Sequence, residues 1–270
     1  MLFQRVLTGI VGGAAFLGAV FYGGAPFTFL IMLLALIAFS EMVHMKKVSS
    51  FSLPACLGYA VTLFYCNPFL FEWIGIEVPA GAVLPVLWLI VPLFLFLSIS
   101  VASKNRYTFQ DMAYLFTGTL YVGLPFQCAL LLREMPGNGL AYFLFVMVVI
   151  WTTDTFAYFV GRALKGPKIW PAISPNKTVS GSIGGVFGAL LVGAVFATVL
   201  DQSWLPWTLL AAVLSVAGQL GDFVESGLKR VLDVKDSGTI LPGHGGVLDR
   251  FDSFLFAAPI AYYLILMWAT

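Results

Sequence analysis

Residues 179–200 read VSGSIGGVFGALLVGAVFATVL and contain no charged side chain. A helix needs about 20 mainly apolar residues to cross the hydrocarbon core of a bilayer. The run is bounded by Lys177 and Asp201, and its many small residues suit close contact between helices in lipid. This stretch therefore predicts a transmembrane helix.

The rest of the chain has the same character, because 60% of its residues are hydrophobic and only 10% are charged. Soluble domains carry about 25% charged residues, so a water-facing surface cannot be built from this composition. We expect an all-α, polytopic transmembrane helical bundle of about nine spans of the length that a bilayer requires. The expected spans are residues 4–22, 26–43, 51–69, 79–100, 108–132, 140–161, 179–200, 206–226 and 251–268.

The basic residues predict the orientation of these spans. Lysine and arginine in short loops favour the cytoplasmic side of a membrane. With a cytoplasmic N-terminus, every lysine and arginine except Arg133 falls in or beside a cytoplasmic segment, whereas Glu72, Glu77 and Asp201 fall outside. One missed span would reverse every later loop, so the sorting supports the number of spans and the orientation together.

The chain is expected to form one membrane domain with two regions. Residues 1–135 are N-terminal transmembrane helices, and residues 136–270 form a catalytic transmembrane region with cytoplasmic loops at 162–178 and 227–250. The net charge of +1 gives no indication of nucleic acid as a partner. Because the polar loops face the cytoplasm, where nucleotides are found, we expect the active site there.

The first polar group of the C-terminal region is Asp154, late in the sixth span. A carboxylate within a membrane is costly and usually faces the bundle interior or a wet cavity. Such a residue can bind a ligand, or it can simply form hydrogen bonds between helices. The sequence leaves both interpretations open.

The second group is Ile173-Ser174-Pro-Asn176-Lys177-Thr178-Val-Ser180-Gly181-Ser182. It places hydroxyl groups, a lysine and a helix start together, and a helix N-terminus favours anions such as phosphate. A helix cap followed by a packing face of small residues explains the stretch equally well.

The third group is Gln219-Leu-Gly-Asp222-Phe-Val-Glu225-Ser226-Gly-Leu-Lys229-Arg230. Asp222 and Glu225 share one helix face, because they are three residues apart. Two such carboxylates repel each other unless a cation lies nearby, and oxygen ligands suit magnesium. Lys229 and Arg230 can bind phosphate or can be a basic pair at the membrane surface.

The fourth group runs from Lys235 to Ser253 and contains Gly243-His244-Gly245-Gly246. Glycine permits a left-handed backbone and a close approach to a ligand. Asp249 and Asp252 are again three residues apart at the start of an apolar helix, which suggests a second edge that faces a metal ion. Carboxylates, basic residues and glycine-rich backbone together indicate a site for metal-bound phosphates. The membrane setting indicates that one substrate is a lipid.

The run from Ser226 to Asp252 closely resembles the signature of phosphatidate cytidylyltransferases, also called CDP-diacylglycerol synthases. The stretches Asp154–Tyr158 and Gln219–Ser226 also look like motifs of this family, so the resemblance covers about residues 150–253. The family usually has an SPKKT-type segment followed by Glu-Gly, where this chain has Asn176 and Ser180.

The resemblance implies the reaction of CTP with phosphatidate to give CDP-diacylglycerol and pyrophosphate, with Mg²⁺ and with a second metal ion as an option. Asp222 and Asp249 would be metal ligands, with Glu225 and Asp252 as further candidates. Family members are often homodimers. Apart from the resemblance, the compact form of the chain, in which we identify no targeting extension, leads us to expect a multi-pass protein of the cell inner (plasma) membrane. The resemblance assigns catalytic roles to Asp222, Lys229, Arg230, Lys235, Asp236, His244, Asp249 and Arg250, and substrate binding to Asp154, Ser174, Lys177, Thr178, Ser226, Ser237, Gly243, Gly245 and Gly246.

Two other functions would use the same residues differently. Another CTP-dependent membrane enzyme, such as a polyprenol kinase or an archaeal-type lipid cytidylyltransferase, would share the site and differ in the lipid. A transporter would use Asp154, Asp222 and Glu225 as an ion pathway. The sequence has no paired broken helices in matching halves, and its polar residues gather at one membrane face, which disfavours the transporter.

Overall fold

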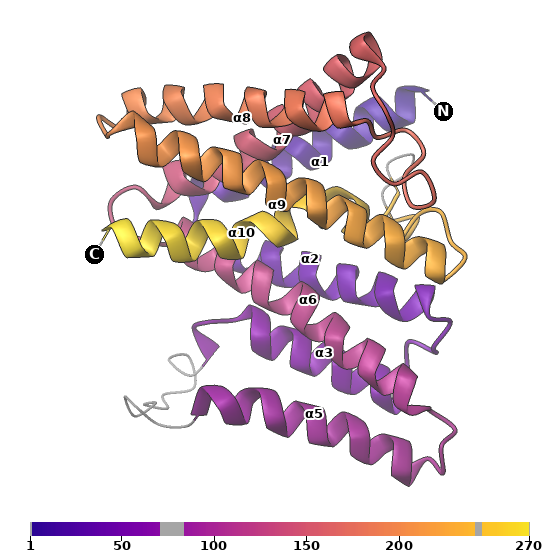
Figure 1. Cartoon of the computed structure of the whole chain (residues 1–270). Helices are drawn as coiled ribbons and strands as arrows, with labels where there is room; N and C mark the ends of the chain where they lie inside the picture. Colours follow the sequence, from indigo (N-terminus) through magenta and orange to yellow (C-terminus); the bar gives the residue numbers. More distant parts are fainter. Residues whose placement is uncertain (1, 71–83, 241–244, 270) are drawn as a thin grey trace. The chain divides into compact units, whose positions relative to one another are not determined.

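The computed structural model describes residues 2–70, 84–240 and 245–269. These residues form helices and no β-strand, so the all-α prediction is confirmed (Figure 1). The helices are α1 (Leu2–Tyr22), α2 (Gly24–Met45), α3 (Leu53–Cys66), α5 (Leu84–Ala102), α6 (Phe109–Arg133), α7 (Gly139–Leu164), α8 (Val179–Val199), α9 (Trp204–Val231) and α10 (Leu248–Ala269).

Each predicted span corresponds to one of these helices, although residues 79–83 lie outside the described residues. Within the described ranges, 6 helices are long and apolar enough to cross a membrane: α2, α6, α7, α8, α9 and Leu248–Trp268 of α10. Three apolar segments are shorter: Val11–Tyr22, Leu53–Cys66 and Val86–Ala102. The structure is thus that of a helical membrane protein, while the count of about nine spans and the cytoplasmic N-terminus stay predictions.

The chain divides into two compact units. The first unit contains Met1–Leu130 together with Ser237–Leu248, and the second contains Leu131–Asp236 together with Asp249–Thr270. The described residues at both ends of the short segment Ser237–Leu248 therefore pack with helices that lie far before them in the sequence.

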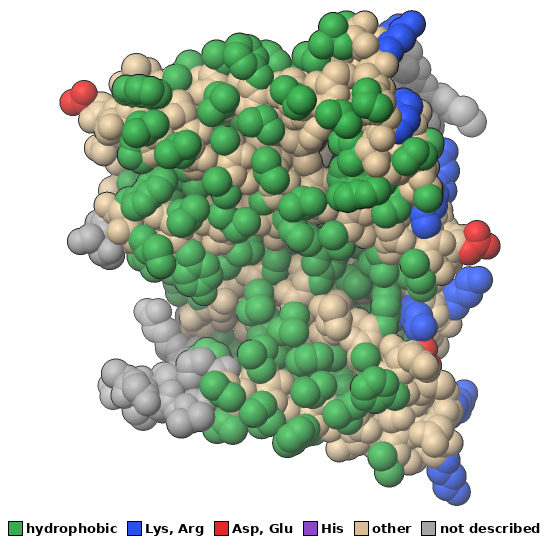
Figure 2. Space-filling view, in the orientation of Figure 1, with side chains coloured by type: hydrophobic (Ala, Val, Ile, Leu, Met, Phe, Trp, Pro, Cys, Tyr) green, Lys and Arg blue, Asp and Glu red, His purple; other side chains and the backbone are tan. Residues whose placement is uncertain are grey.

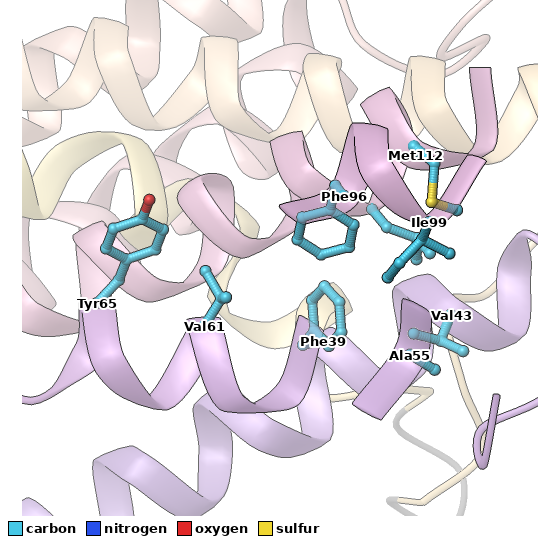
Figure 3. Close-up of a cluster of buried hydrophobic side chains, with 9 residues drawn as sticks. Phe39, Val43, Ala55, Val61, Tyr65, Phe96, Ile99 and Met112 are labelled. Atoms are coloured by element: carbon cyan, nitrogen blue, oxygen red, sulfur yellow. The ribbon is translucent and has the colours of Figure 1, made fainter. Parts of the chain in front are cut away.

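A cluster of buried apolar side chains holds the first unit together (Figure 3). Four helices contribute to it, and the hydroxyl groups of Tyr65 and Tyr114 donate hydrogen bonds to the backbone oxygens of Trp88 (2.8 Å) and Met42 (3.0 Å). These bonds satisfy the polar end of each ring, so that the ring itself can be buried. The cluster comprises Phe39 and Val43 of α2, Ala55, Val61 and Tyr65 of α3, Phe96 and Ile99 of α5, and Met112 and Leu115 of α6.

Glycines set the packing of the second unit, in which α8 contacts both α7 and α9. A Cβ atom at Gly184 would lie 2.6 Å from Val160, and one at Gly188 would lie 2.6 Å from the ring of Phe156. At Gly193 the nearest atoms would be backbone atoms of α9. Small residues let helix backbones approach closely where lipid supplies no hydrophobic driving force.

The opposite face of α8 is apolar and exposed. Ile183, Phe187, Leu191 and Val195 recur every fourth residue and are 47–66% exposed. Hydrophobic side chains also cover much of the helix surface visible in Figure 2, while lysines and arginines gather near the helix ends. A surface of this kind is stable in contact with lipid tails, with the charges at the level of the headgroups.

Most helix ends differ from the predicted boundaries by one or more residues, and two of these differences concern predicted site residues. Helix α9 continues to Val231, beyond the predicted end at residue 226, and Glu225 and Lys229 form an ion pair along the added turn. Helix α10 begins at Leu248, three residues before the predicted start at residue 251. As a result, Lys229, Arg230 and Asp249 lie on helices and have the fixed directions of helical side chains.

Candidate active site

A cavity of about 710 Å³ lies in the second unit, among α7, α8, α9 and the loop before α8. Its size is within the range of small-molecule sites, about 300–1,000 Å³. Four basic residues line it together with two carboxylates and several hydroxyl and amide groups. The polar lining residues are Arg162, Lys165, Lys168, Lys177, Asp154, Asp222, Tyr158, Asn176, Thr178, Ser182 and Gln219.

The loop between α7 and α8 forms one wall of this cavity. Lys168 and Thr178 form an isolated antiparallel bridge, and the backbone N–H of Ile169 donates to the oxygen of Lys177 at 3.2 Å. The side chain of Thr178 then caps α8 by accepting from the N–H of Gly181 at 3.1 Å. The bridge and the cap hold Lys177 at the start of α8, where the positive end of the helix dipole favours anions.

Lys177 forms an ion pair with Asp222 of α9, which also accepts a hydrogen bond from Ser226 at 3.2 Å. The ammonium group of Lys177 lies 4.4 Å from the centre of the Phe223 ring, a favourable cation–π distance. The second and third polar groups of the sequence therefore meet at this point, which their separation in the chain did not show.

Three carboxylates from three helices act on one another electrostatically. Asp154 of α7 and Asp252 of α10 each interact with Asp222 of α9, and Asp252 also interacts with Asp154. Lys177 and Arg250 are the positive charges that act on Asp154. Carboxylates that act on one another in this way repel, and the positive charge of Lys177 offsets part of that repulsion.

A hydrogen-bond network joins α7, α8 and α9 beside these carboxylates. Ser182 donates to the side-chain oxygen of Gln219, whose amide nitrogen donates to Ser215 Oγ at 3.3 Å. Thr153 donates to the same Ser215 oxygen at 2.9 Å. Buried polar networks of this type fix the relative position of helices because every broken bond leaves an unsatisfied group.

Lys229 lies in a different cluster of the second unit. Its ammonium group is 2.5 Å from Glu225 Oε2 and 2.7 Å from Asp249 Oδ1. The side chains of Lys229, Glu225 and Asp249 are 12%, 1% and 7% exposed, respectively. Lys229 is thus largely buried between two carboxylates, and in the part of the chain that the structure describes the second oxygen of Glu225, Oε1, has no hydrogen-bond partner.

The predicted metal ligands, Asp222 and Asp249, lie in two different clusters of carboxylates and lysines. Within the described residues, no group of three or more His, Cys, Asp or Glu side chains is arranged to hold a metal ion. Mg²⁺ usually takes only one or two protein carboxylates and completes its shell with water and substrate phosphates. Asp222 and its neighbouring carboxylates supply hard oxygen ligands of this kind, so the residues fit Mg²⁺ together with a phosphate substrate.

In the first unit, the segment Ser237–Leu248 is held by Glu41 of α2. The Glu41 carboxylate accepts hydrogen bonds from Ser237 Oγ at 2.9 Å and from the backbone N–H groups of Val247 and Leu248 at 2.8 Å each. Sequence reasoning did not single out Glu41. The signal was available, since Glu41 is an acidic residue within the apolar run 26–43.

The other predicted site residues occupy varied positions. Ser174 is half-buried and donates its backbone N–H to the backbone oxygen of Trp170, while Arg230 donates to the backbone oxygen of Ile173 at 3.4 Å.

The fourth polar group of the sequence contributes three exposed charged residues, Lys235, Asp236 and Arg250. Gly245 has a positive φ of 81°, as the glycine-rich motif predicts. Gly243 and His244 lie outside the described residues.

Comparison with known proteins gives one consistent result. The cytidylyltransferase family model matches residues 3–268. Phosphatidate cytidylyltransferase of Bacillus subtilis (strain 168) is 42% identical, with 98% of each chain aligned. The proteins of the same name from Staphylococcus epidermidis (strain RP62A) and Staphylococcus haemolyticus (strain JCSC1435) are 41% and 40% identical, with 97% of this chain and 98% of each relative aligned. The chain therefore belongs to the cytidylyltransferase family and is an enzyme of the nucleotidyltransferase class.

Proposed function

We propose that this enzyme transfers CMP from CTP to phosphatidate, giving CDP-diacylglycerol and pyrophosphate at the cytoplasmic face of the membrane. The names of its relatives support the substrates. The six long apolar helices support a lipid acceptor, because phosphatidate is presented by the membrane itself.

The cavity of the second unit is the observation that carries this proposal. It combines Asp154 and Asp222 with Arg162, Lys165, Lys168 and Lys177 at the ends of membrane helices. A nucleoside triphosphate carries several negative charges, and its binding requires cationic side chains, backbone N–H groups or a metal ion. The start of α8 and the four basic residues provide such an environment.

The reaction needs positioning and charge neutralisation more than acid–base chemistry. An oxygen of the phosphatidate phosphate attacks the α-phosphorus of CTP, a new P–O–P bond forms, and the bond from the α-phosphorus to the bridging oxygen breaks as pyrophosphate leaves. The attacking oxygen is already anionic, so no general base is required. Lys177 and Lys168 are placed to neutralise phosphate oxygens, and Thr178 holds the helix start beside them.

Asp222 is the residue we propose as the main Mg²⁺ ligand, with Asp252 and Asp154 as its neighbours. When bound, Mg²⁺ would neutralise charge on the triphosphate and on the leaving pyrophosphate. Both ligands that the motif predicts are paired with a lysine, Asp222 with Lys177 and Asp249 with Lys229, so a metal ion would compete with a lysine at either carboxylate. The homodimer that the family resemblance implies stays a prediction.

Pyrophosphate release by the purified enzyme tests the proposal. The assay contains CTP, phosphatidate and Mg²⁺, and each is omitted in turn. We expect release only when all three are present, and we expect Asp222→Asn to lower its rate by about 100- to 1,000-fold. The matched control is Asp201→Asn, which removes a carboxylate from the loop between α8 and α9, away from the cavity residues.

The products separate the alternatives. Release of CDP in place of pyrophosphate would identify a CTP-dependent kinase, and release without phosphatidate would identify a different acceptor. Ion flux through liposomes without CTP turnover would favour the transporter. Any of these outcomes in folded protein would overturn the proposed reaction.

A further inference from the structure

Glu41 is a buried carboxylate that the proposed reaction does not yet use. It lies in the last part of α2, a helix long and apolar enough to cross a membrane, and it is only 2% exposed. Burial of a carboxylate costs several kcal/mol unless hydrogen bonds or an opposite charge compensate it. A buried carboxylate at this position therefore needs partners that compensate its charge.

Three hydrogen-bond donors to Glu41 lie at the two ends of the segment Ser237–Leu248. Ser237, at the start of the segment, donates to Oε2, while Val247 and Leu248, at its end, donate to Oε1 and Oε2. The donors lie 196 to 207 residues from Glu41 in the chain. One carboxylate thus fastens both ends of the segment to α2.

The bonds from Val247 and Leu248 are those of a helix cap. Leu248 is the first residue of α10, and the first N–H groups of a helix have no partner within the helix. A carboxylate at this position satisfies them and interacts favourably with the positive end of the helix dipole. Glu41 therefore caps α10 from a distant part of the chain, and the first turns of α10 carry Asp249, Arg250 and Asp252.

Two glycines of the segment leave room for this carboxylate. A Cβ atom at Gly238 would lie 2.7 Å from Glu41 Oε1, and one at Gly246 would lie 2.4 Å from Oε2 and 2.1 Å from Ser237 Oγ. Such distances are far below normal contact, so a side chain at either position would push the carboxylate from its donors. These glycines are thus explained by the approach of Glu41.

We propose that Glu41 is a positioning residue for nucleotidyl transfer: it fixes Ser237 and the backbone N–H groups of Val247 and Leu248 at the start of α10, and so orients Asp249, Arg250 and Asp252, which follow on the same helix. The inference rests on the proposed function, because these residues are taken to serve phosphate chemistry. A merely structural Glu41 would affect the amount of folded protein. A positioning residue affects the turnover of each folded molecule.

The test uses three variants of the full-length enzyme in detergent. Glu41→Gln keeps the size of the side chain but turns an N–H₂ group toward backbone donors, Glu41→Ala removes the acceptor, and Gly246→Ala displaces it. The controls are Asp201→Asn and Gly18→Ala, since a Cβ atom at Gly18 has no neighbour within 4 Å. For each variant we would measure kcat, KM for CTP, thermal unfolding, and hydrogen exchange of the backbone amides of Val247 and Leu248.

We expect Glu41→Gln and Gly246→Ala each to lower kcat per folded molecule by about 10- to 100-fold, the usual effect of losing an orienting partner. Amide exchange at Val247 and Leu248 should accelerate in both variants and stay slow in the controls. The double variant Glu41→Gln, Gly246→Ala should have a kcat no lower than that of the more severe single variant, because both changes break the same contact.

Two results would overturn the inference. One is a kcat within twofold of the wild type for folded Glu41→Gln and Gly246→Ala. The other is fast exchange of Val247 and Leu248 in the wild type, which needs no turnover to be measured. If the amides of Val247 and Leu248 exchange slowly in the wild type but no CDP-diacylglycerol is formed, the proposed function is contradicted. The hydrogen bonds of Glu41 to these two amides are then still supported. If Glu41→Ala fails to fold, the other two variants still decide the question.

Discussion

Lys229 shows how the surroundings of a residue restrict its role. The family signature assigns it to catalysis, and sequence reasoning also allowed phosphate binding or a place at the membrane surface. The structure buries it between Glu225 and Asp249. Its charge is already used to compensate two carboxylates that would otherwise be buried together, so we infer that it holds α9 and the start of α10 in register.

Loss of Lys229 should therefore destabilise the enzyme. We expect Lys229→Met to reduce the free energy of unfolding by about 3–5 kcal/mol, because it leaves buried carboxylates without a counter-charge. Thermal unfolding in detergent measures this, and Lys229→Met combined with Glu225→Gln should recover part of the loss. The control is Lys235→Met, which removes an exposed lysine. Equal stability of Lys229→Met and the control would contradict the structural role.

Single substitutions can show whether Asp222 or Asp249 is the main Mg²⁺ ligand. We expect Asp222→Asn to lower kcat by about 100- to 1,000-fold, the scale of losing one strong electrostatic contribution at a reacting centre. We also expect it to raise the Mg²⁺ concentration needed for half-maximal rate. Titration of Mg²⁺ in the pyrophosphate assay measures both. If Asp249→Asn changes the Mg²⁺ dependence and Asp222→Asn does not, Asp249 is the main ligand and our assignment is wrong.

At the scale of elements, α8 is defined by its two faces. One face carries the exposed apolar residues Ile183, Phe187, Leu191 and Val195, and the other carries glycines against α7 and α9. The apolar length of α8 was readable from the sequence because hydropathy is a local property. The identity of the residues opposite each glycine was not, since it depends on how the helices cross.

Packing at Gly193 provides a test away from the cavity. A Cβ atom there would lie 2.7 Å from Thr208 Cα and from the backbone oxygen of Trp207. Backbone atoms cannot turn aside as side chains can, so we expect Gly193→Ala to destabilise the enzyme by about 1–3 kcal/mol. Thermal unfolding is the measurement. Gly12→Ala is the control, because a Cβ atom at Gly12 has open space and alanine favours a helix.

The helix ends near the site show where prediction from hydropathy stops. The apolar pattern ends near residue 226, but the helix does not, because the Glu225–Lys229 ion pair supports another turn to Val231. Likewise α10 begins at Leu248, where Glu41 supplies its cap. Charged residues can continue a helix once partners satisfy them, and partners from other helices are not visible in a local pattern.

For the whole molecule, the orientation in the membrane is the main prediction still to be tested. We expect the loop that contains Lys165 to face the cytoplasm and the loop that contains Asp201 to face outside. The test starts from a variant in which Cys56, Cys66 and Cys128 are replaced. A single new cysteine, Lys165→Cys or Asp201→Cys, then shows by its labelling on which side of the membrane each loop lies. An impermeant thiol reagent added to intact cells should label only Asp201→Cys, and permeabilised cells should allow both reactions. Labelling of Lys165→Cys in intact cells would reverse the orientation and contradict a cytoplasmic site.

The sequence by itself determined the helical membrane class, the approximate position of the described helices and the nucleotidyltransferase class of the enzyme. These follow from hydropathy and from motif residues that lie close together in the chain. Only the tertiary structure decided that Lys177 pairs with Asp222, that Lys229 lies between Glu225 and Asp249, and that Glu41 accepts hydrogen bonds from Ser237, Val247 and Leu248. The physical reason is that a charge buried among helices is stable only with its partner, and folding brings that partner from another part of the chain.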